Sequence, residues 1–444
     1  MSTLPRCEPA AEGRAARVTA SARPRIAFFD YPDVFEDFYP HYGVDQQRFA
    51  TRFADTANHA LLGLLQREVG DVTWYAFSIA PVLREARHEV VGCRVCLRRS
   101  PPLHRALWRA FYGPRSTWRR RWPEAWRVYA PLASYASLLS WRFLRELARE
   151  RPDFLFTQDY STGRFDVLAA AARWLGIPLV AYHSGSRPEW YHGRLAKRAT
   201  LRSARRLLVS SQAEGRQLTS LFGVDPARLV LFLGSVDTQL YRPLERTRAC
   251  REAGLDPARR HLLFVGRLDD RVKRVGALIE AFGALAERHP GSDLVITGDG
   301  PDRAALTRLA ASRAPAGRVR FTGWIADAAA RAQLYNAADC LVLPSRSEGF
   351  PAVVGEAAAC GTPALASRVG GIGEFLREGA TGWLVEPGDD AALRERLAFA
   401  LAHPEELAAM RPAARRCAEE RLAPAVAAEI LRGCFASEAS AACC

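Results

Sequence analysis

Short runs of β-branched and aromatic residues alternate with helix-length segments along the whole chain, and this alternation limits the fold more than any other feature. Strands separated by helix-length connections form parallel sheets with crossover helices on both faces. The sequence predicts a first series of strands at 26–30, 72–77, 154–158, 179–183, 206–211 and 229–233. It predicts a second series at 262–266, 294–298, 319–322, 340–344, 364–367 and 383–386.

The two series indicate two domains, because 444 residues exceed one ordinary core. We therefore predict an α/β protein with two Rossmann-like, doubly wound domains facing a central cleft, where such sheets bind ligands beyond the carboxyl ends of their strands. The expected segments are a mobile tail (1–24), an N-terminal domain (25–235), a joint (236–260), a C-terminal domain (261–404), a helix crossing back (405–434) and a tail (435–444).

The N-terminal 24 residues contain no apolar run like that of a signal peptide, and no stretch of 18 apolar residues occurs in the chain. A cytoplasmic protein is expected. Cys93 and Cys96 form a lone pair with no second pair to complete a zinc site.

The net charge of +14 is unevenly distributed. Only two of the 62 basic residues are lysines, Lys197 and Lys273, whereas residues 94–127 hold ten arginines and one acid. Trp118, Trp122 and Trp126 in this segment are four residues apart and would share one helix face. The segment suits an anionic membrane surface, but a helix that packs its tryptophans inward explains the pattern as well. Zinc ligands and motifs for nucleic-acid binding are lacking, so no nucleic-acid partner is expected.

The strongest local motif follows the expected strand at 340–344. The sequence Ser347-Glu348-Gly349-Phe350-Pro351 predicts a loop that leads into a helix carrying Glu356. The amides of Gly349 and Phe350 would then lie at a helix N-terminus, which attracts phosphate groups.

A second motif follows the strand at 262–266. Gly266 lets the backbone approach a ligand, and two cations, Arg267 and Lys273, follow six residues apart. Such cations suit a diphosphate, above all one that departs as a leaving group. Two further strand ends are weaker candidates: the turn with Gly298 and Gly300, which suits a purely structural role equally well, and the main chain near Ile325.

In combination and order, these motifs resemble the retaining GT-B glycosyltransferases of family 4, over most of residues 229–400. The resemblance implies a transferase that moves a hexosyl unit from a UDP- or GDP-linked sugar to a glycan or lipid-linked acceptor, without a metal or cofactor. Arg267 and Lys273 would stabilise the diphosphate, Glu348 would bind the donor sugar and Glu356 the ribose. His183, at a strand end of the first domain, matches the histidine that this family places against the donor sugar.

The resemblance fails after the first strand. Members of the family usually carry a glycine-rich loop there, whereas this chain has residues 30–42, which are crowded with aromatics and acids. Two interpretations stay open: an acceptor pocket in which Asp33, Glu36, Asp37 or His41 meets hydroxyls, or a packed loop. A sugar-nucleotide epimerase or a phosphorylase of the same fold is the alternative function.

Overall fold

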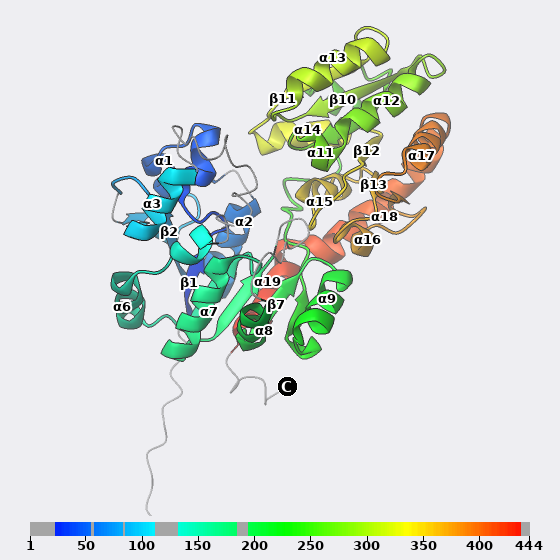
Figure 1. Cartoon of the computed structure of the whole chain (residues 1–444). Coiled ribbons are helices and arrows are strands. Elements are labelled where there is room, and N and C mark those ends of the chain that lie inside the picture. The colour runs from blue at the N-terminus through cyan, green and yellow to red at the C-terminus, as the bar shows by residue number, and fades with distance from the viewer. Residues whose placement is uncertain (1–22, 55–56, 83–84, 112–131, 184–193, 437–444) are drawn as a thin grey trace, which may run out of the picture.

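The computed structural model describes residues 23–54, 57–82, 85–111, 132–183 and 194–436, which form two lobes (Figure 1). Each lobe is built on one sheet, with strand order β3-β4-β2-β1-β5-β6-β7-β8 in the N-terminal lobe and β11-β10-β9-β12-β13-β14 in the C-terminal lobe. All neighbouring strands are parallel except β3 and β4. The predicted α/β architecture with two doubly wound sheets is confirmed.

The strands of the N-terminal lobe are β1 (Arg25–Phe29), β2 (Asp71–Ser78), β3 (Ala86–Arg87), β4 (Arg94–Arg99), β5 (Phe154–Gln158), β6 (Leu179–Tyr182), β7 (Arg206–Val209) and β8 (Leu229–Leu231). Its helices are α1 (Gln46–Thr51), α2 (Ala57–Leu64), α3 (Pro102–Phe111), α6 (Trp141–Glu150), α7 (Gly163–Leu175), α8 (Arg194–Ser203) and α9 (Gln212–Phe222), with shorter turns η1 (Phe35–Asp37), η2 (Tyr39–Tyr42), η3 (Leu65–Val69) and η4 (Pro226–Arg228).

The strands of the C-terminal lobe are β9 (Arg260–Val265), β10 (Ser292–Thr297), β11 (Val319–Gly323), β12 (Cys340–Leu343), β13 (Ala364–Ser367) and β14 (Gly382–Val385). Its helices are α10 (Arg246–Glu252), α11 (Asp270–Lys273), α12 (Val275–Ala286), α13 (Arg303–Arg313), α14 (Ala328–Ala337), α15 (Ala352–Ala359), α16 (Ile372–Phe375), α17 (Asp390–Ala402) and α18 (Pro404–Leu422), and α19 (Pro424–Phe435) ends the described chain.

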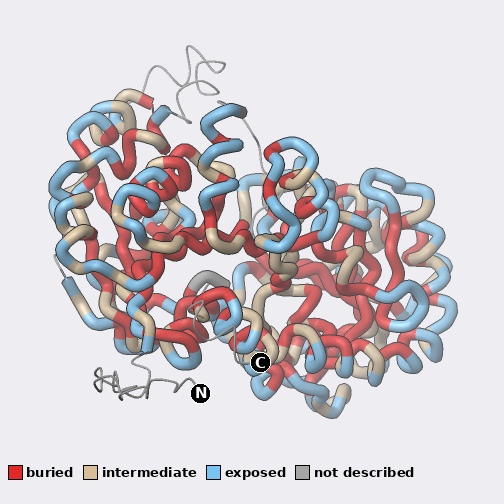
Figure 2. The backbone as a smooth tube through the Cα atoms, turned by 90° about the horizontal axis from the view of Figure 1, so that it is seen from below, coloured by how far each residue is buried: buried red, intermediate tan, exposed pale blue. Residues whose placement is uncertain are grey.

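Side-chain alternation along the strands builds the two cores of the N-terminal lobe. In β1, Ile26 and Phe28 face one buried cluster, whereas Ala27 and Phe29 face the other. This period of two is expected for a sheet covered on both faces. Figure 2 shows the buried backbone running through the centre of both lobes.

Helix α19 returns to the N-terminal lobe after leaving the C-terminal one (Figure 1). Ala427, Leu431 and Phe435 are members of the buried cluster on one face of the N-terminal sheet. The sequence predicted one helix over 405–434, but the structure has two, because Pro424 favours extended backbone at Ala423, where ψ is 144°.

Two further regions differ from their predictions. Within the expected joint at 236–260, helix α10 buries Ala249 and Cys250 in the core of the C-terminal lobe. Within 94–127, residues 94–99 form strand β4, which sequence reasoning missed; Arg94 and Arg98 there bind Glu150 and Glu146 at 2.8 and 2.5 Å. Residues 112–127, with the three spaced tryptophans, lie outside the described residues, as do residues 1–22 of the expected tail. No helix in the described ranges is long and apolar enough to cross a membrane.

The carboxyl edges of the two sheets meet. The amide of Gln212, the first residue of helix α9 after β7, donates to Oε1 of Glu374 at 3.1 Å. Glu374 lies in α16, the helix that follows β13. Gly371 packs so closely that a Cβ there would lie 2.4 Å from the carbonyl oxygen of Ser210. Residues that follow strands β6 and β12, the neighbours of β7 and β13, therefore flank the contact between the lobes.

Candidate active site

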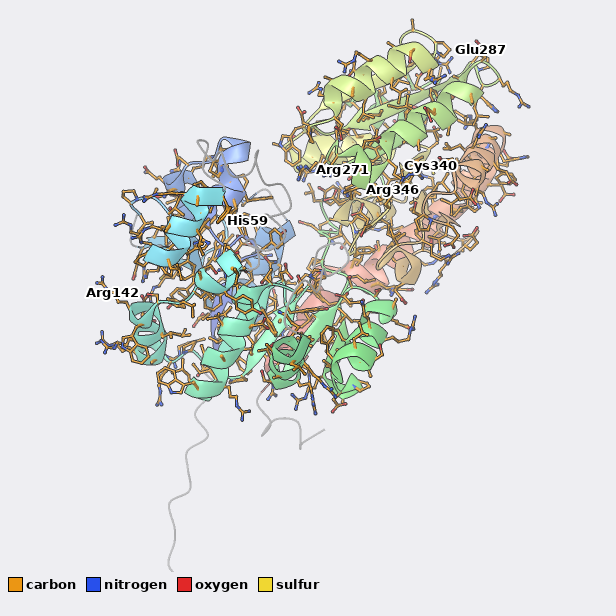
Figure 3. All side chains as sticks on the ribbon, viewed as in Figure 1. His59, Arg142, Arg271, Glu287, Cys340 and Arg346 are labelled. Atoms are coloured by element: carbon orange, nitrogen blue, oxygen red, sulfur yellow. The ribbon has the colours of Figure 1, made fainter. Side chains whose placement is uncertain are left out.

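Two loops of the C-terminal lobe bring Lys273 and Glu348 together. Lys273 ends the short helix α11, and its Nζ lies 2.5 Å from Oε1 of Glu348. The backbone joins the same loops, since the amide of Arg346 donates to the carbonyl of Val272 at 2.8 Å. Figure 3 shows Arg346 and Arg271 close together on one side of this lobe. Two motifs 75 residues apart in sequence thus form one site.

Contacts of the adjacent residues hold Lys273 in position. Arg274 adopts left-handed backbone, with φ of 54°, and its buried guanidinium binds Asp390 at 2.5 Å. The Lys273 side chain passes beside Gly266, where a Cβ would lie 4.0 Å from Lys273 Cε. Arg267 is exposed, and its side chain has no hydrogen bond or ion pair within the described residues. It is therefore available to an anionic ligand.

The loop from β12 to α15 presents unused backbone donors. The carbonyl of Gly349 accepts from the amide of Gly371 at 2.7 Å. The amides of Gly349 and Phe350 have no partner in the described part of the chain, and they stand just before helix α15. Gly370 holds the loop from the other side with φ of 52°, and a Cβ there would lie 2.1 Å from the Gly349 carbonyl oxygen. The Phe350 ring packs on Phe375, 5.2 Å between centroids.

Gly298 and Gly300 support the Gly266 loop by close backbone contact. Gly298 has φ of 137°, and a Cβ there would lie 1.9 Å from the Gly266 carbonyl oxygen. A Cβ on Gly300 would lie 2.5 Å from the carbonyl oxygen of Leu268. Both glycines are required by this packing, whereas their predicted contact with the donor is untested.

Glu356 belongs to a partly buried polar network that sequence reasoning missed. The Tyr335 hydroxyl donates to Oε2 of Glu356 at 2.7 Å, and Arg331 donates to the Tyr241 hydroxyl at 3.1 Å and to the Ile325 carbonyl at 2.9 Å. Burial raises the pKa of Glu356, although Tyr335 and Arg331 oppose the shift. Arg331 thereby links two predicted donor-binding residues, Glu356 and Ile325. One arginine among so many gave no sequence signal.

In the N-terminal lobe, His183 is positioned by Asp159. His183 is buried after β6, and its Nδ1 lies 3.2 Å from Oδ1 of Asp159, the residue after β5. Burial alone would raise the pKa of Asp159, but the hydrogen bonds from His183 and Ser161 outweigh it and hold the pKa below the usual value. An ionised carboxylate only accepts hydrogen bonds, so Nδ1 of His183 carries the hydrogen. Asp159 also has φ of 69°, uncommon for a residue with a side chain.

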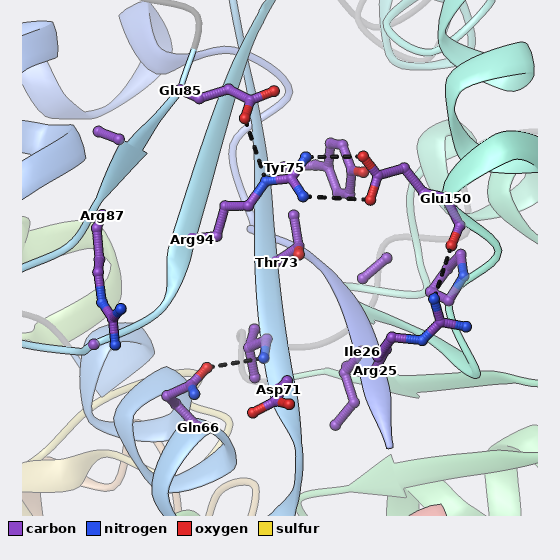
Figure 4. Close-up of a pocket in the computed structure, with 15 residues that line it drawn as sticks. Arg25, Ile26, Gln66, Asp71, Thr73, Tyr75, Glu85, Arg87, Arg94 and Glu150 are labelled. Atoms are coloured by element: carbon purple, nitrogen blue, oxygen red, sulfur yellow. Dashed lines mark hydrogen bonds and ion pairs between the residues drawn. The ribbon is translucent and has the colours of Figure 1, made fainter. Parts of the chain in front are cut away.

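A pocket of about 650 Å³ lies at the opposite edge of the N-terminal sheet (Figure 4). It is lined by the first residues of three strands, Arg25, Asp71 and Arg94. Arg94 lies between Glu85 and Glu150, at 3.4 and 2.8 Å. Because open α/β sheets bind ligands at the carboxyl ends of their strands, this pocket is not the candidate active site.

Both halves of the chain match models of known families. Residues 246–417 match "Glycosyl transferases group 1" and residues 72–240 match "Glycosyltransferase Family 4". D-inositol 3-phosphate glycosyltransferase of Actinosynnema mirum is 35% identical over 294 residues, which cover 60% of this chain and 69% of the relative. The enzyme of the same name from Rhodococcus opacus is 33% identical over 298 residues, 62% of this chain and 66% of the relative. The matched part is thus about two thirds of each relative.

Solved structures share the fold at low identity. Sucrose-phosphate synthase from Thermosynechococcus elongatus superposes with a TM-score of 0.68 at 20% identity, covering 93% of this chain and 98% of the other. Anabaena Alr3699/HepE in complex with UDP gives a TM-score of 0.66 at 17% identity, covering 92% and 98%. The two-lobed fold of this chain is therefore also found in solved structures.

Proposed function

Because the chain belongs to the glycosyl transferases group 1 family, we propose that it transfers a hexosyl unit from a UDP- or GDP-linked sugar to a hydroxyl group of a glycan or lipid-linked acceptor, with retention of anomeric configuration. The observation that carries the proposal is the Lys273–Glu348 pair, beside the amides of Gly349 and Phe350, which have no partner among the described residues. Cation, carboxylate and backbone donors suit the diphosphate and the sugar of one donor molecule.

The pair leaves binding capacity on both partners. An ammonium group has three donors, of which one reaches Oε1 of Glu348. The others are available to phosphate oxygens, while Oε2 of Glu348 can accept from a sugar hydroxyl. Lys273 thus orients the carboxylate and binds the diphosphate, and the exposed Arg267 adds a second positive charge.

In the proposed reaction the bond between the anomeric carbon and the diphosphate breaks as the acceptor oxygen approaches from the same face. The acceptor hydroxyl gives its proton to a diphosphate oxygen, and the new bond forms on the face that the leaving group vacates. Lys273 and Arg267 stabilise the charge that develops on the diphosphate, which needs no metal ion. His183, oriented by Asp159, would contact the donor sugar from the other lobe.

The test is release of nucleoside diphosphate from a panel of UDP- and GDP-sugars, with product stereochemistry followed by NMR. We expect turnover with one donor class, a product with the donor's anomeric configuration, and near-complete loss of turnover in a folded Glu348→Ala variant. Formation of an epimer from donor alone would instead support the epimerase alternative. Full turnover by Glu348→Ala would contradict the proposed site.

A further inference from the structure

The loop after β1 places several carboxylates at the carboxyl edge of the N-terminal sheet. Strands β1 and β5 are neighbours, with Phe29 opposite Thr157, so Asp30 and the loop that follows lie beside Asp159. Asp33 and Asp37 are half-buried in this loop, while Tyr31 is 51% exposed. Burial of the Tyr31 hydroxyl and the charges of Asp159, Asp33 and Asp37 raise its pKa.

Asp33 retains an open acceptor position, whereas both oxygens of Asp37 accept a hydrogen bond. Oδ1 of Asp33 accepts from the Ser134 hydroxyl at 3.2 Å, and its Oδ2 has no hydrogen-bond partner among the described residues. Oδ1 of Asp37 accepts from the Trp108 indole at 2.8 Å. Packing alone does not need half-buried carboxylates at this place, because burial disfavours their charge.

A buried arginine beneath the loop has unused donors. Arg164, in the first turn of α7, is 2% exposed and donates from Nη1 to the carbonyl oxygens of Asp30, at 2.9 Å, and Pro32. Its Nε and Nη2 are buried without a hydrogen-bond partner in the described part of the chain. Ser134 joins this arginine to the acids, since its Oγ accepts from the Arg164 amide at 3.1 Å and donates to Asp33.

A site with both carboxylate acceptors and guanidinium donors suits a hydroxyl group better than a phosphate. A hydroxyl donates to one group and accepts from another, so it satisfies a carboxylate and a guanidinium at once. A phosphate only accepts, and at this loop it would meet the half-buried carboxylates of Asp33 and Asp37, whose burial already disfavours negative charge. The exposed ring of Tyr31 offers the flat apolar face on which a sugar ring stacks.

We propose that Tyr31, Asp33, Asp37 and Arg164 form the acceptor subsite, and that it takes an uncharged polyhydroxylated ring and discriminates against phosphorylated acceptors. This inference rests on the proposed transferase function. The subsite adjoins the donor sugar, because Asp159 also holds His183. The two relatives described above are named for a phosphorylated acceptor, D-inositol 3-phosphate, so this proposal distinguishes the chain from them.

The experiment compares matched acceptors with the full-length protein: inositol with inositol 3-phosphate, and glucose with glucose 6-phosphate. Donor hydrolysis without acceptor is measured in parallel and reports on the donor site alone. We expect the unphosphorylated member to give at least a tenfold higher kcat/KM. Asp33→Asn and Asp37→Asn should each lower that value about 10- to 100-fold, as expected when a hydrogen bond to a charged group is lost, with donor hydrolysis unchanged.

The matched control is Asp71→Asn, which removes an exposed carboxylate from the opposite edge of the same sheet. We expect it to leave both rates unchanged. Preference for the phosphorylated members, or unchanged acceptor kinetics in both Asp33→Asn and Asp37→Asn, would overturn the subsite while donor hydrolysis persists. Absence of donor hydrolysis and of transfer in the wild-type protein would instead refute the underlying transferase function.

Discussion

Both lysines of this arginine-rich chain form close ion pairs. Lys197 binds Asp166 at 3.0 Å and Lys273 binds Glu348 at 2.5 Å. An ammonium is a compact charge that can point its donors at different partners, whereas a guanidinium is a planar fork that favours one carboxylate. A lysine at position 273 can therefore serve Glu348 and a diphosphate together. Its rarity is a sequence signal that no single arginine in this chain provides.

Removing this cation should impair the chemical step. We expect Lys273→Ala to lower kcat about 10²- to 10³-fold, the loss that follows removal of one group that stabilises developing charge. Lys273→Arg should restore only part of the rate, because the fork engages Glu348. The measurement is steady-state release of nucleoside diphosphate. Arg308→Ala, an exposed charge deletion on α13, should behave as wild type; an equal loss there would refute the specific role.

The burial of Asp33, in the loop after β1, should make the free energy of unfolding depend on pH. Burial raises the pKa of Asp33 from 3.8 to about 6, against the opposing charge of Arg164. Between these values the folded chain holds a proton that the unfolded chain has lost, so the unfolding free energy falls as pH rises from about 4 to 6, by at most about 3 kcal/mol.

Asp33→Asn mimics the protonated form and should remove this decline. Urea unfolding should show the variant equal to wild type near pH 4 and more stable above pH 6.5. Asp71→Asn, an exposed substitution in the same sheet, is the control and should keep the decline seen in the wild type. A variant that is less stable than wild type at pH 7 would show that the Asp33 charge serves the fold, contrary to a role in binding.

At the level of elements, the sequence predicted most strands but missed the neighbouring strands β3 and β4. Each expected strand has its counterpart because apolar runs of strand length are bounded by polar or glycine residues. Strand β4 was not predicted because its short apolar run is flanked by Arg94, Arg98 and Arg99. The acids that pair with Arg94 and Arg98 are Glu85, just before β3, and two glutamates of α6, and this pairing exists only in three dimensions.

The sequence predicted the site residues that lie in contiguous motifs, but not those that reach the site through contacts between distant parts of the chain. Lys273 and Glu348 lie in local patterns that the sequence displays, and the structure places them together. Arg331 and Arg164 act on residues brought near by folding, so composition could not distinguish them from other arginines. Their roles, and those predicted for His183 and Glu356, stay predictions.

The glycine turn after β10 gives a test at this scale. Gly298→Ala would force a Cβ to 1.9 Å from the Gly266 carbonyl oxygen at φ of 137°. We expect a loss of about 2 to 4 kcal/mol in unfolding free energy from overpacking and backbone strain together, and weaker donor binding by calorimetry. Gly291→Ala is the control, since a Cβ there meets no atom within 4 Å. Equal stability of the two variants would contradict the packing argument.

At the scale of the whole molecule, helix α19 follows the C-terminal lobe in sequence but packs in the core of the N-terminal lobe. Helix α18 packs on α15 and α17, and α19 then enters the core of the N-terminal lobe. The buried cluster on one face of the N-terminal sheet is therefore completed by residues that follow the whole C-terminal lobe in sequence. Loss of α19 packing should weaken the N-terminal lobe selectively, although the change lies at the far end of the chain.

Phe435 is the residue through which this dependence can be measured. Its ring lies 5.3 Å from that of Phe154 and 5.8 Å from that of Phe156, both in β5. Phe435→Ala should destabilise the N-terminal lobe by about 3 to 5 kcal/mol, the usual result of emptying a core site of this size. Hydrogen exchange should accelerate in β5 and β6 but not in β9 or β12, while Glu429→Ala, exposed on the same helix, should change neither set. Because Asp159, which binds His183, directly follows β5, acceptor turnover should fall with the lost protection. Equal acceleration in both sheets would mean that the lobes unfold as one unit.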